Sequence, residues 1–271
     1  MKRRMRDTKT NQMRLGMEIN PEDYTRYIRN LLFVVDGGEN VGKMGAIEGT
    51  CFLLKFQNTY YVITTKHGLG DFKINDLKIM LNPYSTDESI MLRALAIEDA
   101  CSFNGHDGSM YYDDDLDDYV IIRVHREEPS ELIDEFFFPY RPIDKSDFAN
   151  NPKLVVAGYP TCGQDIDYDD HVGDFGATIV FPYKFEPSST RENQFILYAK
   201  QAHGIVSFDG FSGSPVFLHF PSGDIKVLGM VLRATASSGV FNCLFLSVVI
   251  KAIVLSSYLQ EKGIAPDELT N

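Results

Sequence analysis

The chain has 271 residues, of which 44% are hydrophobic, and its formal net charge at pH 7 is −12. This length suits an all-β protein built as a double barrel or a sandwich, and the apolar content is enough for a sizeable core. The negative charge argues against a general nucleic-acid surface, because phosphate binding needs clustered Lys and Arg. We therefore expect no nucleic-acid partner.

The N-terminus carries a basic cluster at residues 2–6, but no apolar stretch follows it. We therefore expect neither an export signal nor a contact with membranes. The cysteines are scattered, with no CxxC pair and no metal-ligand spacing, at Cys51, Cys101, Cys162 and Cys243. We interpret them as reduced, mostly buried thiols of a cytoplasmic protein, and we expect neither a metal nor another cofactor.

Residues 1–20 are polar and lack periodicity, which predicts a mobile N-terminal arm. A helix is expected next, because Asn20-Pro21-Glu22-Asp23 offers a capping residue, a proline at the first position and acids in the first turn. Short β-type runs follow, separated by turns, at 31–35, 50–56, 60–64, 76–81, 91–97 and 119–124. Residues 21–128 are therefore predicted to form this helix and a first β subdomain.

Prolines and charged residues become frequent after residue 126, so we interpret residues 129–152 as a crossing between two subdomains. A second set of β-type runs follows, at 153–157, 176–181, 194–199, 214–220, 225–233 and 240–245. The segment from Ser247 to Gln260 is apolar at helical spacing and predicts a C-terminal helix docked on this set. Residues 153–262 are thus predicted to form a second β subdomain and this helix.

The stretch Phe208–Leu218 crowds Gly, Ser and Pro into a tight turn that runs into an apolar β-type segment. Gly210 and Gly213 flank Ser212, so the backbone can fold sharply and leave its N–H groups free to face a ligand. Such a turn can bring a serine hydroxyl and two amides into one small space, as acyl-transfer chemistry requires. An ordinary hairpin loop has the same composition, so other parts of the chain must decide.

Two further stretches place chemistry-bearing residues at the ends of apolar strands. The run 60–64 leads into a polar corner with His67, and although a lone histidine is more often a surface residue, a rigid scaffold would present a base there. The acidic run 113–118 leads into the run 119–124, and we interpret most of it as a solvated loop. Its last acid, Asp118, touches the buried strand and needs a partner to stay ionised, which an imidazole N–H can provide.

In the order His, Asp, Ser, these stretches resemble the motifs of trypsin-like (chymotrypsin-fold) serine peptidases of the intracellular bacterial kind. Thr64-Thr65-Lys66-His67 resembles the family's Thr-Ala-x-His corner, and Asp118–Val124 resembles its Asp-Ile-Ala-Leu-Leu-Lys-Leu strand. Gly210–Val216 resembles Gly-Asp-Ser-Gly-Gly-Pro, while Gly49–Leu53 and Val156–Pro160 fit near the starts of the two barrels. The resemblance implies an all-β fold with two six-stranded antiparallel β-barrels and short terminal helices.

The resemblance also implies roles for single residues. It makes His67 the general base, Asp118 the residue that orients it and Ser212 the nucleophile, with the amides of Gly210 and Ser212 as the oxyanion hole. Strand alternation places Asp117 and Asp118 on opposite faces, and the family register favours Asp118. The implied activity is that of a serine endopeptidase that acts on a protein or peptide substrate through an acyl-enzyme.

Two positions depart from the secreted and zymogen-forming members of the family. Gly68 stands where secreted relatives have a cysteine after the histidine, as a cytoplasmic protein would require. Phe211 stands where activated zymogens have an aspartate that pairs with a newly cut N-terminus, so we expect no activation by N-terminal insertion. A peptidase without this switch needs another restraint, for which a regulatory protein partner is one candidate.

The resemblance places Val206 at the base of the primary specificity pocket. It places Leu232 and Ala234 on the strand that pairs with the substrate backbone, with Ala234 beside the pocket. A preference for Lys or Arg would require a buried acid at the pocket base. We therefore expect a medium-sized apolar substrate residue on the carbonyl side of the cleaved bond.

Other functions fit the sequence less well. An α/β-hydrolase would need Gly-x-Ser-x-Gly with the acid and the histidine after the serine, whereas here both precede Ser212. Asp165, Asp167 and Asp169 alternate like the start of a calcium loop, but Asp170 stands where that loop needs a glycine. The rival that stays open is a trypsin-like fold without proteolysis, which serves as a peptide-binding or interaction module.

Overall fold

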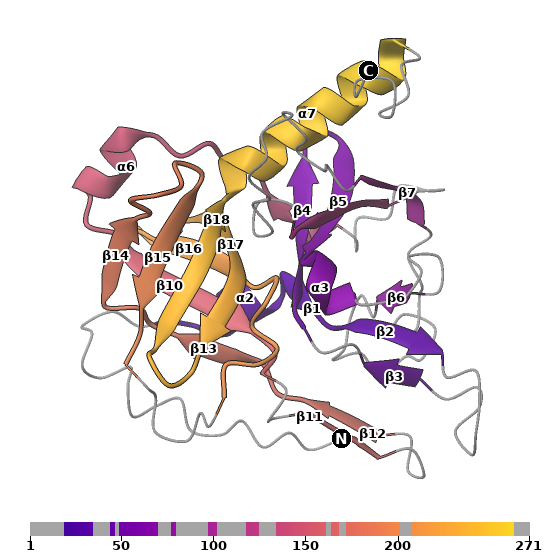
Figure 1. Ribbon diagram of the computed structural model, residues 1–271, viewed down its shortest axis with the longest axis horizontal. Helices are drawn as coiled ribbons and strands as arrows, with labels where there is room; N and C mark the ends of the chain where they lie inside the picture. Colours follow the sequence, from indigo (N-terminus) through magenta and orange to yellow (C-terminus); the bar gives the residue numbers. More distant parts are fainter. Residues whose placement is uncertain are drawn as a thin grey trace.

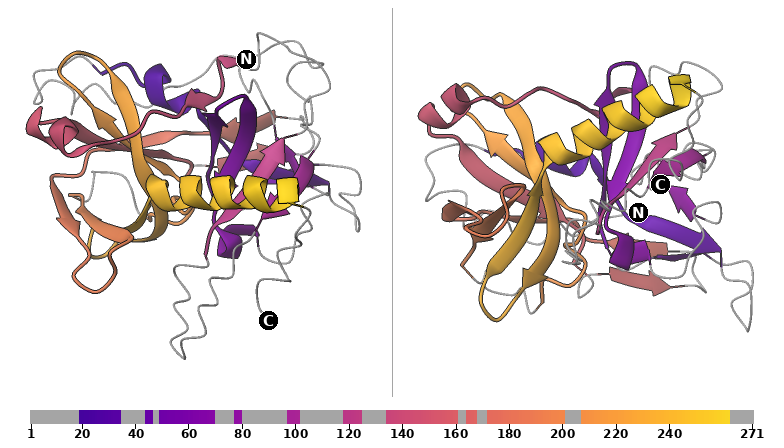
Figure 2. Two further views of the ribbon diagram at one scale, coloured as in Figure 1. Left: turned by 90° about the horizontal axis from the view of Figure 1, so that it is seen from above. Right: turned by 45° about the horizontal axis from the view of Figure 1, so that its top comes forward.

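The computed structural model describes residues 19–34, 44–46, 49–69, 77–79, 97–101, 118–124, 134–160, 164–167, 172–200 and 207–262. The predicted arm therefore lies outside this part of the chain except for its last two residues, of which Ile19 is buried in the core. The described residues form two β-rich halves that lie side by side (Figure 1). A C-terminal helix, α7 (Leu246–Lys262), starts on the second half and runs toward the first, as Figure 2 also shows.

The first half contains two antiparallel sheets that share a bent strand. Its strands are β1 (Ile28–Arg29), β2 (Leu31–Val34), β3 (Met44–Ala46), β4 (Cys51–Phe56), β5 (Thr59–Thr64), β6 (Leu77–Ile79), β7 (Ile97–Cys101) and β8 (Val120–Val124). One sheet has the order β1-β4-β5-β8-β7, with β9 (Phe138–Pro139) added to β4 in parallel, and the other has the order β3-β2-β6. Only Asn30 separates β1 from β2, so the two continue each other from sheet to sheet.

The second half is one sheet that the chain closes into a barrel. Its strands are β10 (Lys153–Gly158), β13 (Thr178–Val180), β14 (Lys184–Pro187), β15 (Gln194–Tyr198), β16 (Pro215–His219), β17 (Ile225–Thr235) and β18 (Val240–Phe245). They pair in the order β13-β10-β16-β17-β18-β15-β14. The two end strands, β13 and β14, are consecutive in the chain, so the seven strands become a ring of six when this pair counts as one bent strand.

Both halves follow the same strand order. In the second half, β16 lies beside β10, which is followed around the barrel by β13/β14, β15, β18 and β17. In the first half, β6 lies beside β2/β1, which is followed by β3/β4, β5, β8 and β7. The expected all-β fold of two antiparallel barrels is confirmed.

An apolar cluster lies between the two halves and joins them. It contains Phe52 of β4, Phe217 of β16 and Leu232 of β17, each of them fully buried. The terminal helices contribute Tyr24 of α2 (Glu22–Thr25) and Ile253 of α7 to the same cluster. Each large side chain buried in this way stabilises the fold by about 1.5–3 kcal/mol. This cluster is therefore a core that the two halves share.

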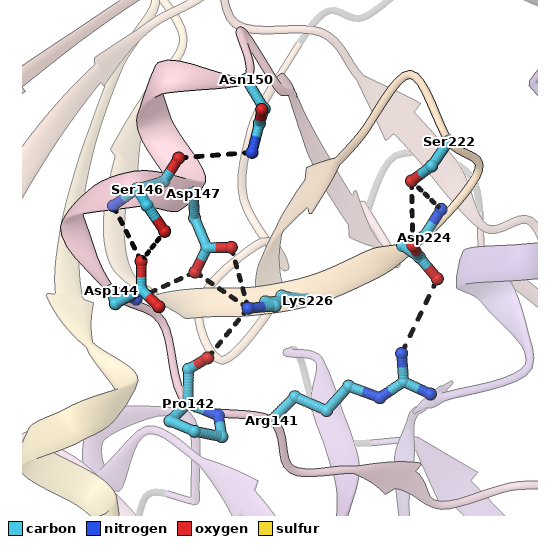
Figure 3. A network of polar contacts seen from close by, with 9 residues as sticks. All are labelled: Arg141, Pro142, Asp144, Ser146, Asp147, Asn150, Ser222, Asp224 and Lys226. Carbon is cyan, nitrogen blue, oxygen red and sulfur yellow. Dashed lines mark hydrogen bonds and ion pairs between the residues drawn. The ribbon is translucent and has the colours of Figure 1, made fainter.

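The crossing between the halves is fastened to β17 by a small polar network (Figure 3). Lys226 donates hydrogen bonds to both carboxylate oxygens of Asp147, at 2.8 and 2.9 Å, and to the carbonyl oxygen of Pro142 at 3.1 Å. Asp147 lies in α6 (Lys145–Ala149), which begins with a capping box made by Asp144. Removing one partner of a largely buried ion pair costs about 3–5 kcal/mol, so this network fixes the crossing against the second barrel.

Most predicted β runs are strands, and the structure also contains strands that were not predicted. The acidic segment that was compared with a calcium loop contains a separate hairpin of β11 (Gln164–Asp167) and β12 (Val172–Phe175). Strand β14 was not predicted, because its partly exposed Lys-Phe-Glu-Pro sequence has little apolar content. Strand β7 begins at Ile97, where the predicted run 91–97 ends, and residues 91–96 lie outside the described residues.

Two of the cysteines are buried in the cores as free thiols. Cys51 and Cys243 make no disulfide and are fully buried. Burial raises the pKa of the Cys51 thiol to about 12 and also raises the pKa of Cys243, so neither is a reactive thiolate. Cys162 lies outside the described residues. As for membranes, no helix within the described ranges combines the length and apolar character needed to cross one.

Candidate active site

The predicted nucleophile lies in a turn that joins the aromatic core to β16. Two glycines flank Ser212 with backbone φ values of +89° at Gly210 and +85° at Gly213, a region that favours glycine. A Cβ atom added at Gly213 would come within 1.9 Å of the Thr50 carbonyl oxygen, so only glycine fits this close approach between the barrels. The sharp turn expected from the Gly/Ser pattern is therefore present.

Phe211 anchors this turn in the second barrel. Its side chain is fully buried and packs edge-on against Phe208 and Phe241, with ring centroids 5.7 and 5.8 Å apart. This residue stands where the resemblance expects the aspartate of activated zymogens. In this chain, apolar packing holds the position that a buried ion pair holds in those relatives, and burying such a ring contributes about 1.5–3 kcal/mol.

Backbone hydrogen bonds fasten the turn to β17. The Gly213 N–H donates to the Val231 carbonyl oxygen at 2.8 Å, and the Val231 N–H donates to the Ser214 carbonyl oxygen at 2.8 Å. Within the turn, the Ser214 N–H donates to the Phe211 carbonyl oxygen at 2.9 Å. The Ser214 side chain is fully buried, and its hydroxyl has no hydrogen-bond partner in the described part of the chain. Ser214 is therefore a packing residue, whereas Ser212 is partly accessible.

The histidine lies just beyond the end of β5, in the first barrel. Buried strand β5 ends at Thr64, and the one-turn helix α3 (Lys66–Leu69) follows and presents His67. The His67 side chain is 44% exposed, which leaves its imidazole accessible to a substrate. Asp118 lies two residues before β8, the strand that pairs with β5, so the sheet brings acid and histidine to the same edge.

The three predicted catalytic residues lie in hydrogen-bonding contact. His67 Nδ1 lies 2.5 Å from Asp118 Oδ2, and His67 Nε2 lies 3.0 Å from Ser212 Oγ. The other carboxylate oxygen, Asp118 Oδ1, accepts from the His67 backbone N–H at 2.9 Å. The Asp118 side chain is only 6% exposed, so both oxygens are satisfied where water has little access. A carboxylate on Nδ1 fixes the tautomer whose Nε2 can accept the serine proton.

The two amides expected to form the oxyanion hole are both unoccupied by protein acceptors. Among the described residues, neither the Gly210 N–H nor the Ser212 N–H has a hydrogen-bond partner. The intervening Phe211 N–H differs, because it donates to the Phe208 carbonyl oxygen at 3.1 Å. Free N–H groups on a turn beside a serine hydroxyl can stabilise an oxyanion that develops there.

The predicted substrate-binding residues differ in how far the structure describes them. Val206 lies outside the described residues. Leu232 is fully buried in the cluster between the barrels, so only its backbone can meet a substrate. Ala234 is partly buried two residues further along β17. A β-bulge between Val231 and Arg233 interrupts the pairing of β17 with β18 beside the nucleophile turn.

Thr50 is the part of the site for which the sequence motif predicted no role. It is fully buried at the start of the first barrel, and its hydroxyl donates to the Gly210 carbonyl oxygen at 2.7 Å. Its backbone N–H donates to the Ser212 carbonyl oxygen at 2.9 Å. The only available signal was its place in the Gly49–Leu53 segment, which indicated the start of a barrel. These contacts span 160 positions in sequence and follow only from the packing of the two halves.

Comparisons with known proteins yield matches only among solved structures. No family model matches the chain, and no curated protein matches it in sequence. A thermostable serine protease, AL20, from an extremophilic microorganism is 13% identical, with a TM-score of 0.49 over 86% of this chain and 96% of that one. The secreted serine protease VesC from Vibrio cholerae is 14% identical, with a TM-score of 0.49 over 86% of this chain and 46% of that one. The assignment of two barrels rests on the strand order described above.

Proposed function

We propose that the chain is a serine endopeptidase that hydrolyses peptide bonds through an acyl-enzyme. The observation that supports this most strongly is the contact of His67 with two partners at once, with Asp118 on Nδ1 at 2.5 Å and Ser212 on Nε2 at 3.0 Å. A buried acid, an accessible imidazole and an accessible serine in this order form the arrangement that activates a serine hydroxyl. The natural role would be the processing of a protein substrate.

The mechanism follows from the positions of these groups. Ser212 Oγ attacks the substrate carbonyl carbon while His67 Nε2 takes its proton, and the Asp118 carboxylate stabilises the imidazolium that forms. The developing oxyanion accepts hydrogen bonds from the N–H groups of Gly210 and Ser212, each worth about 3–4 kcal/mol. His67 then gives its proton to the leaving amine. Water attacks the acyl-enzyme in a second passage through the same site.

We propose that the substrate residue on the carbonyl side of the cleaved bond is apolar and of medium size. Val206 at the expected pocket base carries no charge, and Ala234 is small and only partly buried. The substrate backbone would lie along β17 near the bulge at Leu232, where backbone groups do not follow regular pairing. A cleavage profile over a peptide library that is dominated by basic or acidic residues at this position would contradict the proposal.

We propose that a partner protein in the cytoplasm restrains this activity. The position of the zymogen aspartate is occupied by the buried Phe211, so the family's N-terminal switch has no carboxylate to pair with. The buried free thiols of Cys51 and Cys243 suit a reducing compartment. Affinity purification of the Ser212→Ala variant should recover a second protein in a stoichiometric amount. Purified wild-type protein that is fully active and that cell extracts do not inhibit would contradict this proposal.

A fluorophosphonate probe tests the proposed function. We expect it to label the wild-type protein covalently, with labelling lost in Ser212→Ala and reduced by at least about a hundredfold in His67→Ala, because the general base is missing. Ser214→Ala is the matched control and should still be labelled, since its hydroxyl has no partner among the described residues. A folded wild-type protein that no probe labels would instead favour the binding module.

A further inference from the structure

All three polar atoms of Thr50 form hydrogen bonds, and these bonds connect the nucleophile turn, Tyr159 and Thr64. Its N–H donates to the Ser212 carbonyl oxygen at 2.9 Å, and its hydroxyl donates to the Gly210 carbonyl oxygen at 2.7 Å. The same hydroxyl accepts from the Tyr159 N–H at 2.9 Å, beyond the end of β10. Its carbonyl oxygen accepts from the Thr64 hydroxyl at 3.0 Å. Thr50 is fully buried, so water does not replace these partners.

These bonds fix two peptide planes of the nucleophile turn. The plane between Gly210 and Phe211 is held at its carbonyl by Thr50 and at its N–H by the Phe208 carbonyl oxygen, 3.1 Å away. The plane between Ser212 and Gly213 is held at its carbonyl by Thr50 and at its N–H by the Val231 carbonyl oxygen, 2.8 Å away. A plane held at both edges cannot rotate without breaking two hydrogen bonds.

The remaining freedom of the turn lies at its glycine. Gly210 has no Cβ atom to resist a rotation of its backbone, and its φ of +89° is one of several that glycine can adopt. Rotation there would turn the Gly210 N–H away from the position of an oxyanion. The hydrogen bond from the Thr50 hydroxyl fixes the Gly210 carbonyl on the far side of the same residue, so the rest of the turn cannot rotate together with the Gly210 N–H.

Thr50 also sets the turn relative to the histidine. It belongs to the first barrel, and its bond from Thr64 reaches the last residue of β5, directly before the corner that presents His67. The turn itself belongs to the second barrel. One residue thus relates the base on one barrel to the nucleophile on the other.

We propose that Thr50 is a positioning residue of the reaction. Its side-chain hydroxyl holds the nucleophile turn in the conformation in which the Gly210 and Ser212 N–H groups face the substrate. This inference rests on the proposed function, since it assigns Thr50 a role in stabilising the oxyanion and none in binding the substrate. It predicts that loss of the hydroxyl slows the chemical steps while substrate affinity stays unchanged.

The test compares Thr50→Val, which keeps the shape of the side chain and removes its hydroxyl, with Thr50→Ser, which keeps the hydroxyl. With a p-nitrophenyl ester of an apolar N-acyl amino acid, we expect kcat of Thr50→Val to fall about 10-fold to 100-fold, with KM within about twofold of wild type. Thr50→Ser should restore most of kcat. The matched control is Thr25→Val, at a buried threonine of α2 that lies outside the triad and the nucleophile turn.

Hydrogen exchange gives a readout that does not depend on activity. The Tyr159 N–H, which donates to the Thr50 hydroxyl, should lose protection in Thr50→Val and keep it in Thr50→Ser. Lost protection with an unchanged kcat would overturn the positioning role and leave the proposed function standing. A rise in KM with an unchanged kcat would also overturn it. A wild type that neither turns over the ester nor reacts with the fluorophosphonate would remove the proposed function and, with it, this inference.

Discussion

The histidine corner (residues 64–69) and the nucleophile turn (residues 207–215) supply the reacting groups of one site, but they are held in different ways. The turn is fixed by a fully buried aromatic ring, Phe211, and by backbone hydrogen bonds to β17 and Thr50. The corner leaves the His67 side chain 44% exposed, and among the described residues only Asp118 orients its imidazole from the Nδ1 side. The turn is thus part of the core, whereas the orientation of the base depends on one carboxylate.

This difference predicts that a substitution at the histidine corner or its acid lowers activity and leaves stability almost unchanged. In Asp118→Asn, the single amide oxygen can still accept from the His67 backbone N–H, and the NH₂ group then faces Nδ1 and disturbs the tautomer. We expect kcat to fall about 10⁴-fold while the free energy of unfolding changes by less than about 1 kcal/mol. Steady-state kinetics and urea denaturation measure the two effects.

Asp147→Asn is the control for this variant. Asp147 is also a buried acid, but it pairs with Lys226 in the crossing segment, away from the triad. Its loss should lower the free energy of unfolding and leave kcat near the wild-type value. An Asp118→Asn enzyme that retains more than about a tenth of wild-type kcat would show that the carboxylate is not what activates His67.

Damage to the turn should cost both stability and activity. In Phe211→Ala, the missing ring leaves a cavity beside Phe208 and Phe241, and we expect the free energy of unfolding to fall by about 3–5 kcal/mol. The ester kcat should fall with it, because the Ser212 N–H loses its support. Phe211→Leu should lose less of both, since it fills part of the cavity. A stable Phe211→Ala protein would contradict the contrast between turn and corner.

A third contact, between Tyr24 and His219, lies outside both segments. It should affect stability but not activity, and its effect should depend on pH. The Tyr24 hydroxyl and Nδ1 of His219 on β16 share a hydrogen bond, and both side chains are buried. Burial lowers the pKa of His219, so the unfolded chain binds a proton more readily than the folded one. The stability from the neutral histidine is therefore present above about pH 6.5 and is lost as the pH falls through the lower folded-state pKa.

His219→Gln isolates this contribution, because glutamine offers a neutral acceptor to Tyr24 and does not titrate. Chemical denaturation between about pH 7 and pH 5 should show a shallower loss of stability in the variant than in wild type. The kcat of the two proteins should agree at pH 7. Parallel stability curves over this range would exclude His219 as the titrating group.

The sequence predicted the proposed triad because each proposed catalytic residue lies in a short local motif next to an apolar run. Each of these motifs spans only about ten neighbouring residues: the strand 60–64 with its corner, the acid before 119–124, and the turn around Ser212. The structure places His67 within hydrogen-bonding distance of both Asp118 and Ser212. Their order along the chain, His then Asp then Ser, further supported the resemblance to trypsin-like peptidases.

The features that could not be predicted from the sequence are contacts between distant segments and strands with few apolar residues. The role of Thr50 arises from a hydrogen bond to Gly210, 160 positions away, and no local pattern encodes it. Strand β14 and the hairpin β11–β12 carry too few apolar residues to stand out. Ile19 reads as part of a polar arm, yet it is buried in the cluster between the barrels.

A crystal structure of the protein after reaction with diisopropyl fluorophosphate would test the central claim most directly. We predict a single covalent bond from Ser212 Oγ to phosphorus, with the phosphoryl oxygen about 3 Å from the backbone nitrogens of both Gly210 and Ser212. His67 should still lie between Ser212 and Asp118. An adduct on another residue, a phosphoryl oxygen turned away from both amides, or a folded protein that stays unmodified would contradict the account.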